Sequence, residues 1–285
     1  MRIWIKLILL VFLIIQFKAA FSQEFEMPSF VHAIDACDMD MDGSKDIVVS
    51  CGYQDSLVIL FNDGFGNFYM QGYNKITSNL ICGCVDDDDI PDIITGKEGY
   101  LYFIKNNGDR TLEENIVLME FSGSYTLNSL LDINDDGWND LVYDFPTYWG
   151  ILKNNGDLTL TNYIIGSDGG PVNPSIGYIN NDSLPDILIS YDSGSRSQIT
   201  KYLVNNGNFN FSIHILNNQQ FLAPIISEMN NLFPHDLTLF YNPTNEVHLY
   251  ENTGNATFNF KDIYYINNSA GVEFADKADY NQDGY

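Results

Sequence analysis

The sequence predicts an all-β protein built from repeated units of four antiparallel strands, and three observations support this. An acidic segment recurs at a nearly constant interval, a turn segment with Asn and Gly keeps step with it, and the stretches between them are short and rich in β-branched residues. A fixed period of this length in a chain of short strands is typical of propeller blades. We therefore expect a β-propeller of four-stranded antiparallel blades, with about five complete blades and the start of a sixth.

The first 22 residues have the composition of an export signal. Arg2 and Lys6 form a basic start, Leu7–Ile15 is an unbroken apolar run, and small residues stand at Ala20 and Ser22. This order is typical of a signal peptide, and the apolar run is short for a membrane span. We expect cleavage after Ser22, a secreted or cell-surface protein, and no transmembrane segment after cleavage. An uncleaved membrane anchor is the alternative.

The acidic segment is best kept in two copies. DMDMDGSKD, Asp38–Asp46, and DINDDGWND, Asp132–Asp140, carry Asp or Asn at positions 1, 3, 5 and 9 and Gly at position 6. Weaker copies, CVDDDDIPD, YINNDSLPD and EMNNLFPHD, begin at residues 84, 178 and 228, and DYNQDGY begins another at residue 279. Successive copies start 46, 48, 46, 50 and 51 residues apart. Because the last copy breaks off at Tyr285, we expect the propeller, residues 23–285, to be truncated at its C-terminus.

A second segment follows each acidic copy and predicts a hairpin. Its copies are LFNDGFGNF, FIKNNGDRTL, ILKNNGDLTL, YLVNNGNFNF and LYENTGNATFNF. Asn-Gly and Asp-Gly tolerate the positive φ that tight hairpin turns need. The apolar runs DIVVSC, DIITG, DLVYD, DILIS and DLTLF, each starting at the last Asp of an acidic copy, are predicted strands. One unit is therefore expected to run strand, acidic loop, strand, short connection, strand, Asn-Gly turn, strand.

The spacing of the acidic copies predicts a calcium site. A coiling loop can direct alternate side chains inward, and oxygen ligands in this number suit Ca²⁺, which takes roughly six to eight oxygens. The expected ligands are the side chains at positions 1, 3, 5 and 9 and the backbone carbonyl at position 7. In the two best copies these residues are Asp38, Asp40, Asp42, Ser44 and Asp46, and Asp132, Asn134, Asp136, Trp138 and Asp140. The weaker copies keep Asp86, Asp88 and Asp92, then Asn180, Asp182 and Asp186, and finally Asp279, Asn281 and Asp283.

Two other structures could also account for an acidic loop of this kind. An acidic turn that merely caps a hairpin is one, and we favour it for the fifth copy, where Leu232 and Phe233 replace the expected polar residue and glycine. An EF-hand is the other, but it needs Glu at position 12 and a helix on each side. Position 12 is Val49 in the first copy and Tyr143 in the third, and the flanks are strand-like.

With its D-x-D-x-D-G-x-x-D loop, the apolar strand that follows and the N-N-G-x-x-x-F-like turn, the chain resembles the FG-GAP/VCBS repeat family. This family includes the propeller of integrin α-chains and many exported bacterial proteins. The resemblance covers nearly all of the chain after the signal. It implies a propeller, commonly seven-bladed, with calcium in hairpin loops near one face, and an exported protein of bacterial type.

Composition limits the partners. The formal net charge of −25 disfavours nucleic acid and anionic membrane surfaces. The expected function is an exported calcium-binding repeat scaffold that binds an unknown protein or glycan in adhesion at the cell surface. Tyr148 and Trp149 are candidate ligand contacts, although we favour a place in the blade core.

No catalytic constellation is evident in the sequence. The histidines lie in unrelated phases of the repeat, and there is no Gly-x-Ser-x-Gly, no His-Glu-x-x-His and no phosphate loop. We therefore do not expect an enzyme. The alternative is that the chain is the propeller portion, catalytic or not, of a polysaccharide-degrading enzyme.

The chain has four cysteines, Cys37, Cys51, Cys82 and Cys84. In an oxidising compartment an even count permits two disulfides, and the sequence leaves all three pairings open. A zinc site is not expected, because Cys82-Gly83-Cys84 has the wrong spacing and hard oxygen ligands surround it.

Overall fold

Twenty strands form five separate four-stranded sheets in the described part of the chain. The computed structural model describes residues 23–52, 56–166, 172–192, 198–217, 221, 223–227, 234–241 and 244–266. The predicted signal peptide and the acidic copy with Asp279, Asn281 and Asp283 lie outside these residues. Over the same ranges, no helix has the length and apolar character needed to cross a bilayer.

Each sheet is one blade, and its strands pair in sequence order and antiparallel. Blade 1 contains β1 (Val31–Cys37), β2 (Asp46–Cys51), β3 (Ser56–Asn62) and β4 (Phe68–Asn74). Blade 2 contains β5 (Asn79–Gly83), β6 (Asp92–Lys97), β7 (Tyr100–Ile104) and β8 (Ile116–Glu120). Blade 3 contains β9 (Thr126–Leu131), β10 (Asp140–Asp144), β11 (Trp149–Asn154) and β12 (Leu160–Gly166). Blade 4 contains β13 (Val172–Gly177), β14 (Asp186–Asp192), β15 (Gln198–Asn205) and β16 (Phe211–Asn217), and blade 5 contains β17 (Ala223–Ser227), β18 (Asp236–Tyr241), β19 (Glu246–Asn252) and β20 (Phe258–Tyr265).

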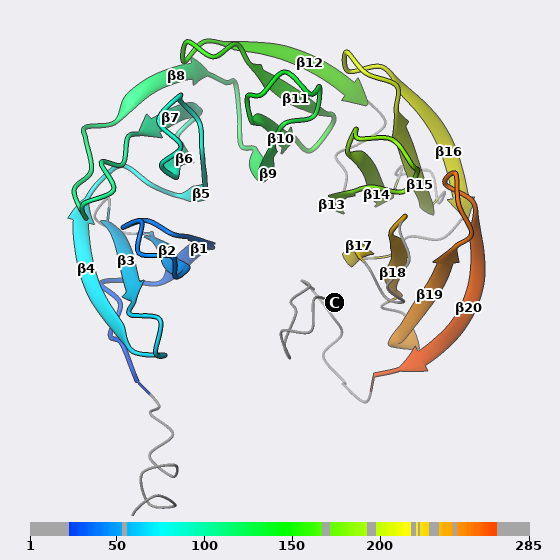
Figure 1. Cartoon of the computed structure of the whole chain (residues 1–285), viewed down its shortest axis with the longest axis horizontal. Coiled ribbons are helices and arrows are strands. Elements are labelled where there is room, and N and C mark those ends of the chain that lie inside the picture. The colour runs from blue at the N-terminus through cyan, green and yellow to red at the C-terminus, as the bar shows by residue number, and fades with distance from the viewer. Residues whose placement is uncertain are drawn as a thin grey trace, which may run out of the picture.

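The blades stand side by side around a central space, as Figure 1 shows. The first strand of each blade lies innermost and the fourth forms the outer rim (Figure 1). The second and third strands are almost wholly buried, as in β2 and β3, whereas the outer strand β4 alternates between exposed and half-buried residues. Continuous apolar runs such as IVVSC are therefore middle strands covered on both faces, which is why they lack the alternation of a half-exposed strand.

The hydrophobic core lies between neighbouring blades. Val48 and Ile59 of blade 1 pack in one cluster with Leu80 and Ile93 of blade 2. Similar clusters join blades 2 and 3, blades 3 and 4, and blades 4 and 5. Trp149 is 3% exposed within the cluster between blades 3 and 4, which confirms its predicted place in the core. Stability is thus shared between blades rather than held within each one.

The strand order places the loops at two opposite ends of the blades. In blades 1 to 4, the acidic loop that joins the first and second strands shares one end with the Asn-Gly or Asp-Gly turn that joins the third and fourth strands. The other end holds the turns between the second and third strands of blades 2 and 3, and the described connections from blade 1 to blade 2 and from blade 2 to blade 3. The positive φ of Gly108 and Gly156, 72° and 81°, confirms the predicted Asn-Gly turns.

One disulfide is present, between Cys37 of β1 and Cys82 of β5, with Cα atoms 6.2 Å apart. It joins blade 1 to blade 2 beside their acidic loops. Cys51 is a buried free thiol at the far end of β2, and Cys84 is a half-buried free thiol just after β5. Cys84 lies at the end of the blades that carries the acidic loops, and Cys51 lies at the opposite end of β2. Because β2 is about 17 Å long at the usual rise per residue, these two thiols lie too far apart for a second disulfide.

Candidate metal sites in the acidic loops

Local hydrogen bonds coil the first acidic loop. Asp38 accepts the backbone N–H groups of Asp42 at 3.0 Å and Gly43 at 2.9 Å. Asp42 accepts the N–H of Ser44 at 2.8 Å. Gly43 has a φ of 92°, which favours glycine at position 6. The side chains at positions 1 and 5 therefore close a tight turn as well as carrying charge.

The third loop coils in the same way. Asp132 accepts the N–H groups of Asp136 at 3.2 Å and Gly137 at 2.7 Å. Asn134 differs from its counterpart Asp40, because its amide donates to Asp136 at 2.9 Å. The side chain at position 3 of this loop is therefore hydrogen-bonded to the side chain at position 5.

The structure gathers carboxylates in two loops. Oxygens of Asp38, Asp40 and Asp42 lie within 4.8 Å of one another, and so do oxygens of the three acidic residues of the second loop, Asp86, Asp88 and Asp92. Among the described residues these are the two groups of three or more acidic, His or Cys side chains that come this close. The third loop has Asn134 at position 3, so only two of its positions 1, 3 and 5 carry a carboxylate, and the metal site predicted there stays a prediction.

Each of the two groups contains a buried carboxylate oxygen that lacks a hydrogen-bond partner, Asp40 Oδ1 and Asp92 Oδ2. The side chain of Asp40 is 6% exposed and Asp92 is fully buried. Burying an unpaired anionic oxygen is unfavourable. Burial also raises the pKa of Asp92 to about 7, with Asp86 and Asp88 adding to the rise. A cation held by oxygen ligands would relieve both effects, so the residues fit Ca²⁺.

Basic side chains partly neutralise three of the loops. Arg110, from the turn between β7 and β8, donates to Asp40 Oδ2 from Nε at 2.8 Å and from Nη2 at 2.6 Å. Its guanidinium also lies 4.6 Å from the ring centre of Phe61. The first loop is therefore closed by a cation from the next blade.

In the second and third loops the cation comes from the same blade. The Lys105 ammonium binds Asp86 and, at 2.6 Å, Asp88. Lys153 binds Asp136 in the same way. Each lysine directly precedes the Asn-Asn-Gly segment of its turn, and the equivalent residue is Phe61 in blade 1 and Val204 in blade 4. Sequence reasoning missed these lysines, although their shared position in the repeat was a visible signal.

The Asp at position 9 is buried and bonded to the backbone. Asp46 accepts the N–H groups of Met39 and Asn62, each at 2.8 Å. Asp140 and Asp186 make the equivalent pairs of bonds, to Ile133 and Asn154 and to Ile179 and Asn205. The position-9 carboxylate therefore fixes the start of its loop to the third strand, a structural role that the ligand prediction did not include.

In blades 2 to 5, the Asn two residues before the turn glycine links the blade to the preceding one. Asn106 donates from Nδ2 to the backbone carbonyl of Met39, and Asn154 does so to Val85, each at 2.8 Å. The same bond joins Asn205 to Ile133 and Asn252 to Ile179. We call these four the blade-linking asparagines. Their carbonyl partners all stand at position 2 of the preceding blade's acidic loop.

The fourth loop has its own pattern. Asn180 donates to Asp182 at 2.8 Å, and Asp182 accepts the N–H of Leu184 at 3.0 Å. The basic side chain found in the second and third loops is replaced here by Val204. The three predicted ligands in this loop therefore remain a prediction, with less negative charge than in the first loop.

Comparisons with known proteins identify the fold. No family model matches the chain, and no curated protein matches it in sequence. A solved structure of an Agrocybe aegerita lectin, described as specifically recognising non-reducing terminal N-acetylglucosamine, aligns with a TM-score of 0.61 and 18% identity over 79% of this chain. This chain spans 64% of that lectin's length. BBS1N in complex with ARL6DN aligns with a TM-score of 0.55 and 13% identity, over 85% of this chain and 70% of that one. At these identities the likeness concerns the fold, and it confirms a β-propeller of four-stranded blades.

Proposed function

We propose that this chain is an exported β-propeller scaffold that calcium stabilises and that binds a protein or glycan at the cell surface. The observation behind the calcium proposal is the pairing of clustered carboxylates with a buried, unpartnered carboxylate oxygen in the same loop. It occurs twice, at Asp40 and at Asp92. Ca²⁺ at these places would supply the missing positive charge and fix the hairpin.

Export is supported by the bond between Cys37 and Cys82. Disulfides form and persist mainly in oxidising compartments outside the cytosol. The basic and apolar start of the chain, residues 1–22, agrees with this proposal.

The binding role is supported by the fold and by its relatives. Propellers present loops from several blades on one surface, which suits recognition rather than one fixed chemistry. The two solved relatives above are a sugar-binding lectin and a propeller in complex with another protein. A glycan or protein ligand is therefore the class proposed for this chain.

Thermal unfolding in calcium tests the metal proposal. We expect the midpoint of the metal-free protein to rise in about 10 mM CaCl₂, because a site with a Kd of roughly 10⁻⁴ to 10⁻³ M then adds about 1 to 3 kcal/mol. Equal MgCl₂ should have a smaller effect, because Mg²⁺ gives up its water reluctantly.

A matched pair of variants locates the effect. Asp38→Asn with Asp42→Asn removes two charges from the first loop and should reduce the calcium shift. Glu113→Gln with Glu120→Gln removes two charges from exposed positions in blade 2 and should leave it unchanged. A folded wild-type protein whose midpoint does not respond to calcium would contradict the proposal.

A further inference from the structure

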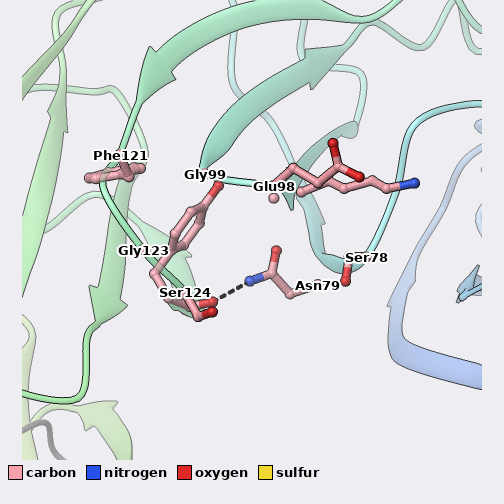
Figure 2. Close-up of a pocket in the computed structure, with 10 residues that line it drawn as sticks. Ser78, Asn79, Glu98, Gly99, Phe121, Gly123 and Ser124 are labelled. Atoms are coloured by element: carbon pink, nitrogen blue, oxygen red, sulfur yellow. Dashed lines mark hydrogen bonds between the residues drawn. The ribbon is translucent and has the colours of Figure 1, made fainter.

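A hollow of about 320 Å³ lies between blades 2 and 3, at the end opposite the acidic loops. Figure 2 shows side chains from three segments converging on it: the start of β5, the turn between β6 and β7, and the connection from β8 to β9. Its lining includes Asn79, Glu98, Phe121, Ser124 and Tyr125. Its size is at the lower end of the range for small-molecule sites, about 300–1,000 Å³.

The hollow exists because the turn in blade 2 is short. Only Glu98 and Gly99 stand between the paired residues Lys97 and Tyr100, and both have positive φ, 53° and 84°. In blade 3, four residues separate the paired Asp144 and Trp149. The two-residue turn leaves the end of the blade uncovered and holds Glu98 at its rim on a rigid hairpin.

The floor of the hollow is fixed in place. Tyr125 donates from its hydroxyl to the carbonyl of Tyr100 at 2.6 Å, and Asn79 donates from Nδ2 to the carbonyl of Tyr125 at 2.6 Å. Gly96 leaves the room for both side chains, since a Cβ there would come within 2.3 Å of Asn79 Oδ1 and 2.6 Å of the Tyr125 hydroxyl. The lining is therefore preorganised before any ligand arrives.

One polar atom of the floor is unsatisfied. Asn79 Oδ1 is buried and has no hydrogen-bond partner. It is an acceptor, so a group with a donor, such as a hydroxyl, would complete it. Glu98 offers further acceptors at the rim, and Ser124 offers a hydroxyl that can donate or accept.

The lining indicates an uncharged ligand. It contains one lysine and one glutamate, so its formal charges balance. It also contains the half-buried ring of Phe121, which packs 4.7 Å from the ring of Tyr125. Fixed acceptors, hydroxyls and an aromatic ring together suit a molecule that has many hydroxyl groups and an apolar ring face. A pyranose sugar has both.

We propose that this hollow, lined by Asn79, Glu98, Phe121 and Ser124, binds a neutral sugar unit. The proposal deepens the glycan arm of the proposed function and rests on it. The site lies at the end of the blades away from the acidic loops, so metal in those loops and sugar in this hollow are separate properties of the molecule.

Saturation-transfer NMR with free glucose, galactose, mannose and N-acetylglucosamine tests the site. We expect transfer to at least one of these sugars. Ser124→Trp, which fills the mouth from an exposed position, and Glu98→Asn, which keeps a residue tolerant of positive φ, should each weaken binding about tenfold or more. Ser122→Trp and Glu120→Gln, at exposed positions outside the lining, should bind as the wild type does.

Two results would overturn the sugar site. One is no transfer to any of these sugars in folded wild-type protein, and the other is transfer that Ser124→Trp leaves unchanged. Thermal midpoints of the same samples with and without calcium separate the two proposals. If calcium raises the thermal midpoint and no sugar binds, the sugar site is rejected and the calcium scaffold is kept. If a sugar binds and calcium leaves the midpoint unchanged, the sugar site is kept and the calcium proposal is rejected.

Discussion

Asn106 of blade 2 donates a hydrogen bond from Nδ2 to the backbone carbonyl of Met39 in blade 1, 67 residues earlier, at a distance of 2.8 Å. The same side chain donates to the carbonyl of Pro91 at 2.9 Å and accepts the N–H of Gly108 at 3.1 Å. One amide therefore joins the turn of its own blade, the acidic loop of its own blade and the acidic loop of the blade before.

Asn106→Ala should destabilise the protein by about 2–4 kcal/mol, because it leaves two carbonyls and one N–H in a buried place without partners. Urea unfolding followed by circular dichroism measures this. Asn107→Ala is the matched control: its amide bonds to Thr111 at an exposed turn, and its loss should cost less than about 1 kcal/mol. Equal effects of the two substitutions would contradict the blade-linking role.

Loss of the disulfide should cost about 4 kcal/mol, the chain-entropy estimate for two cysteines 45 residues apart. Cys37→Ser with Cys82→Ser should show this loss in urea, while Cys84→Ser, at a half-buried free thiol, should change stability little. Peptide mapping under non-reducing conditions should find Cys37 joined to Cys82. A bond from Cys82 to any other cysteine would refute the pairing.

Lys105→Gln should make blade 2 more dependent on calcium. Without metal the variant loses the ammonium that binds Asp86 and Asp88, which should lower stability by about 1 kcal/mol. With calcium, the freed carboxylates can turn fully to the ion, so the calcium-induced rise in the thermal midpoint should exceed that of the wild type. Lys45→Gln, at an exposed position in the first loop, is the control and should respond as the wild type does.

Because of Asp144, the free energy of unfolding of the metal-free protein should fall as the pH rises. Burial raises its pKa to about 6, although Asn128 donates to it at 2.7 Å. Between pH 4 and pH 6, the Asp144 carboxyl keeps its proton in the folded state but has lost it in the unfolded state. Its contribution to the free energy of unfolding is therefore greatest at about pH 4 and declines through that window. The loss should be on the order of 2 kcal/mol.

Asp144→Asn isolates this effect from the other buried carboxylates. Its amide oxygen can still accept the bond from Asn128, but it does not titrate. The free energies of unfolding of wild type and variant are compared from pH 4 to pH 7. As the pH rises, the wild type should lose free energy of unfolding relative to the variant. A constant difference would show that Asp144 has an ordinary pKa in the folded protein.

The blade architecture could be predicted from the sequence because its signals are local. Runs such as DIVVSC and DLVYD became β2 and β10 with the predicted bounds, and the Asn-Gly turns have the expected positive φ. Periodicity and turn chemistry act within a few residues, so one sequence is enough to see them.

The contacts between blades could not be predicted in this way. The local sequence predicts Asn154 as a turn residue and gives no sign of its bond to Val85, 69 residues away. The spacing predicts Asp46 as a metal ligand, but it does not indicate that both of its oxygens accept backbone N–H groups. Arg110 reaches Asp40 across 70 residues, and nothing local marks that pair. Partners this distant depend on how blades pack, which spacing along one chain does not encode.

The blade-linking asparagines impose an order on assembly. The carbonyl of Ile179 is completed by Asn252, 73 residues later, and the carbonyl of Met39 by Asn106, 67 residues later. A chain that leaves a ribosome or a translocation channel N-terminus first must therefore deliver most of the next blade before the acidic loop of the preceding one is locked. During synthesis, the most recently made acidic loop therefore still lacks its hydrogen bond from the following blade. Each blade gains this bond only when the next blade has been made.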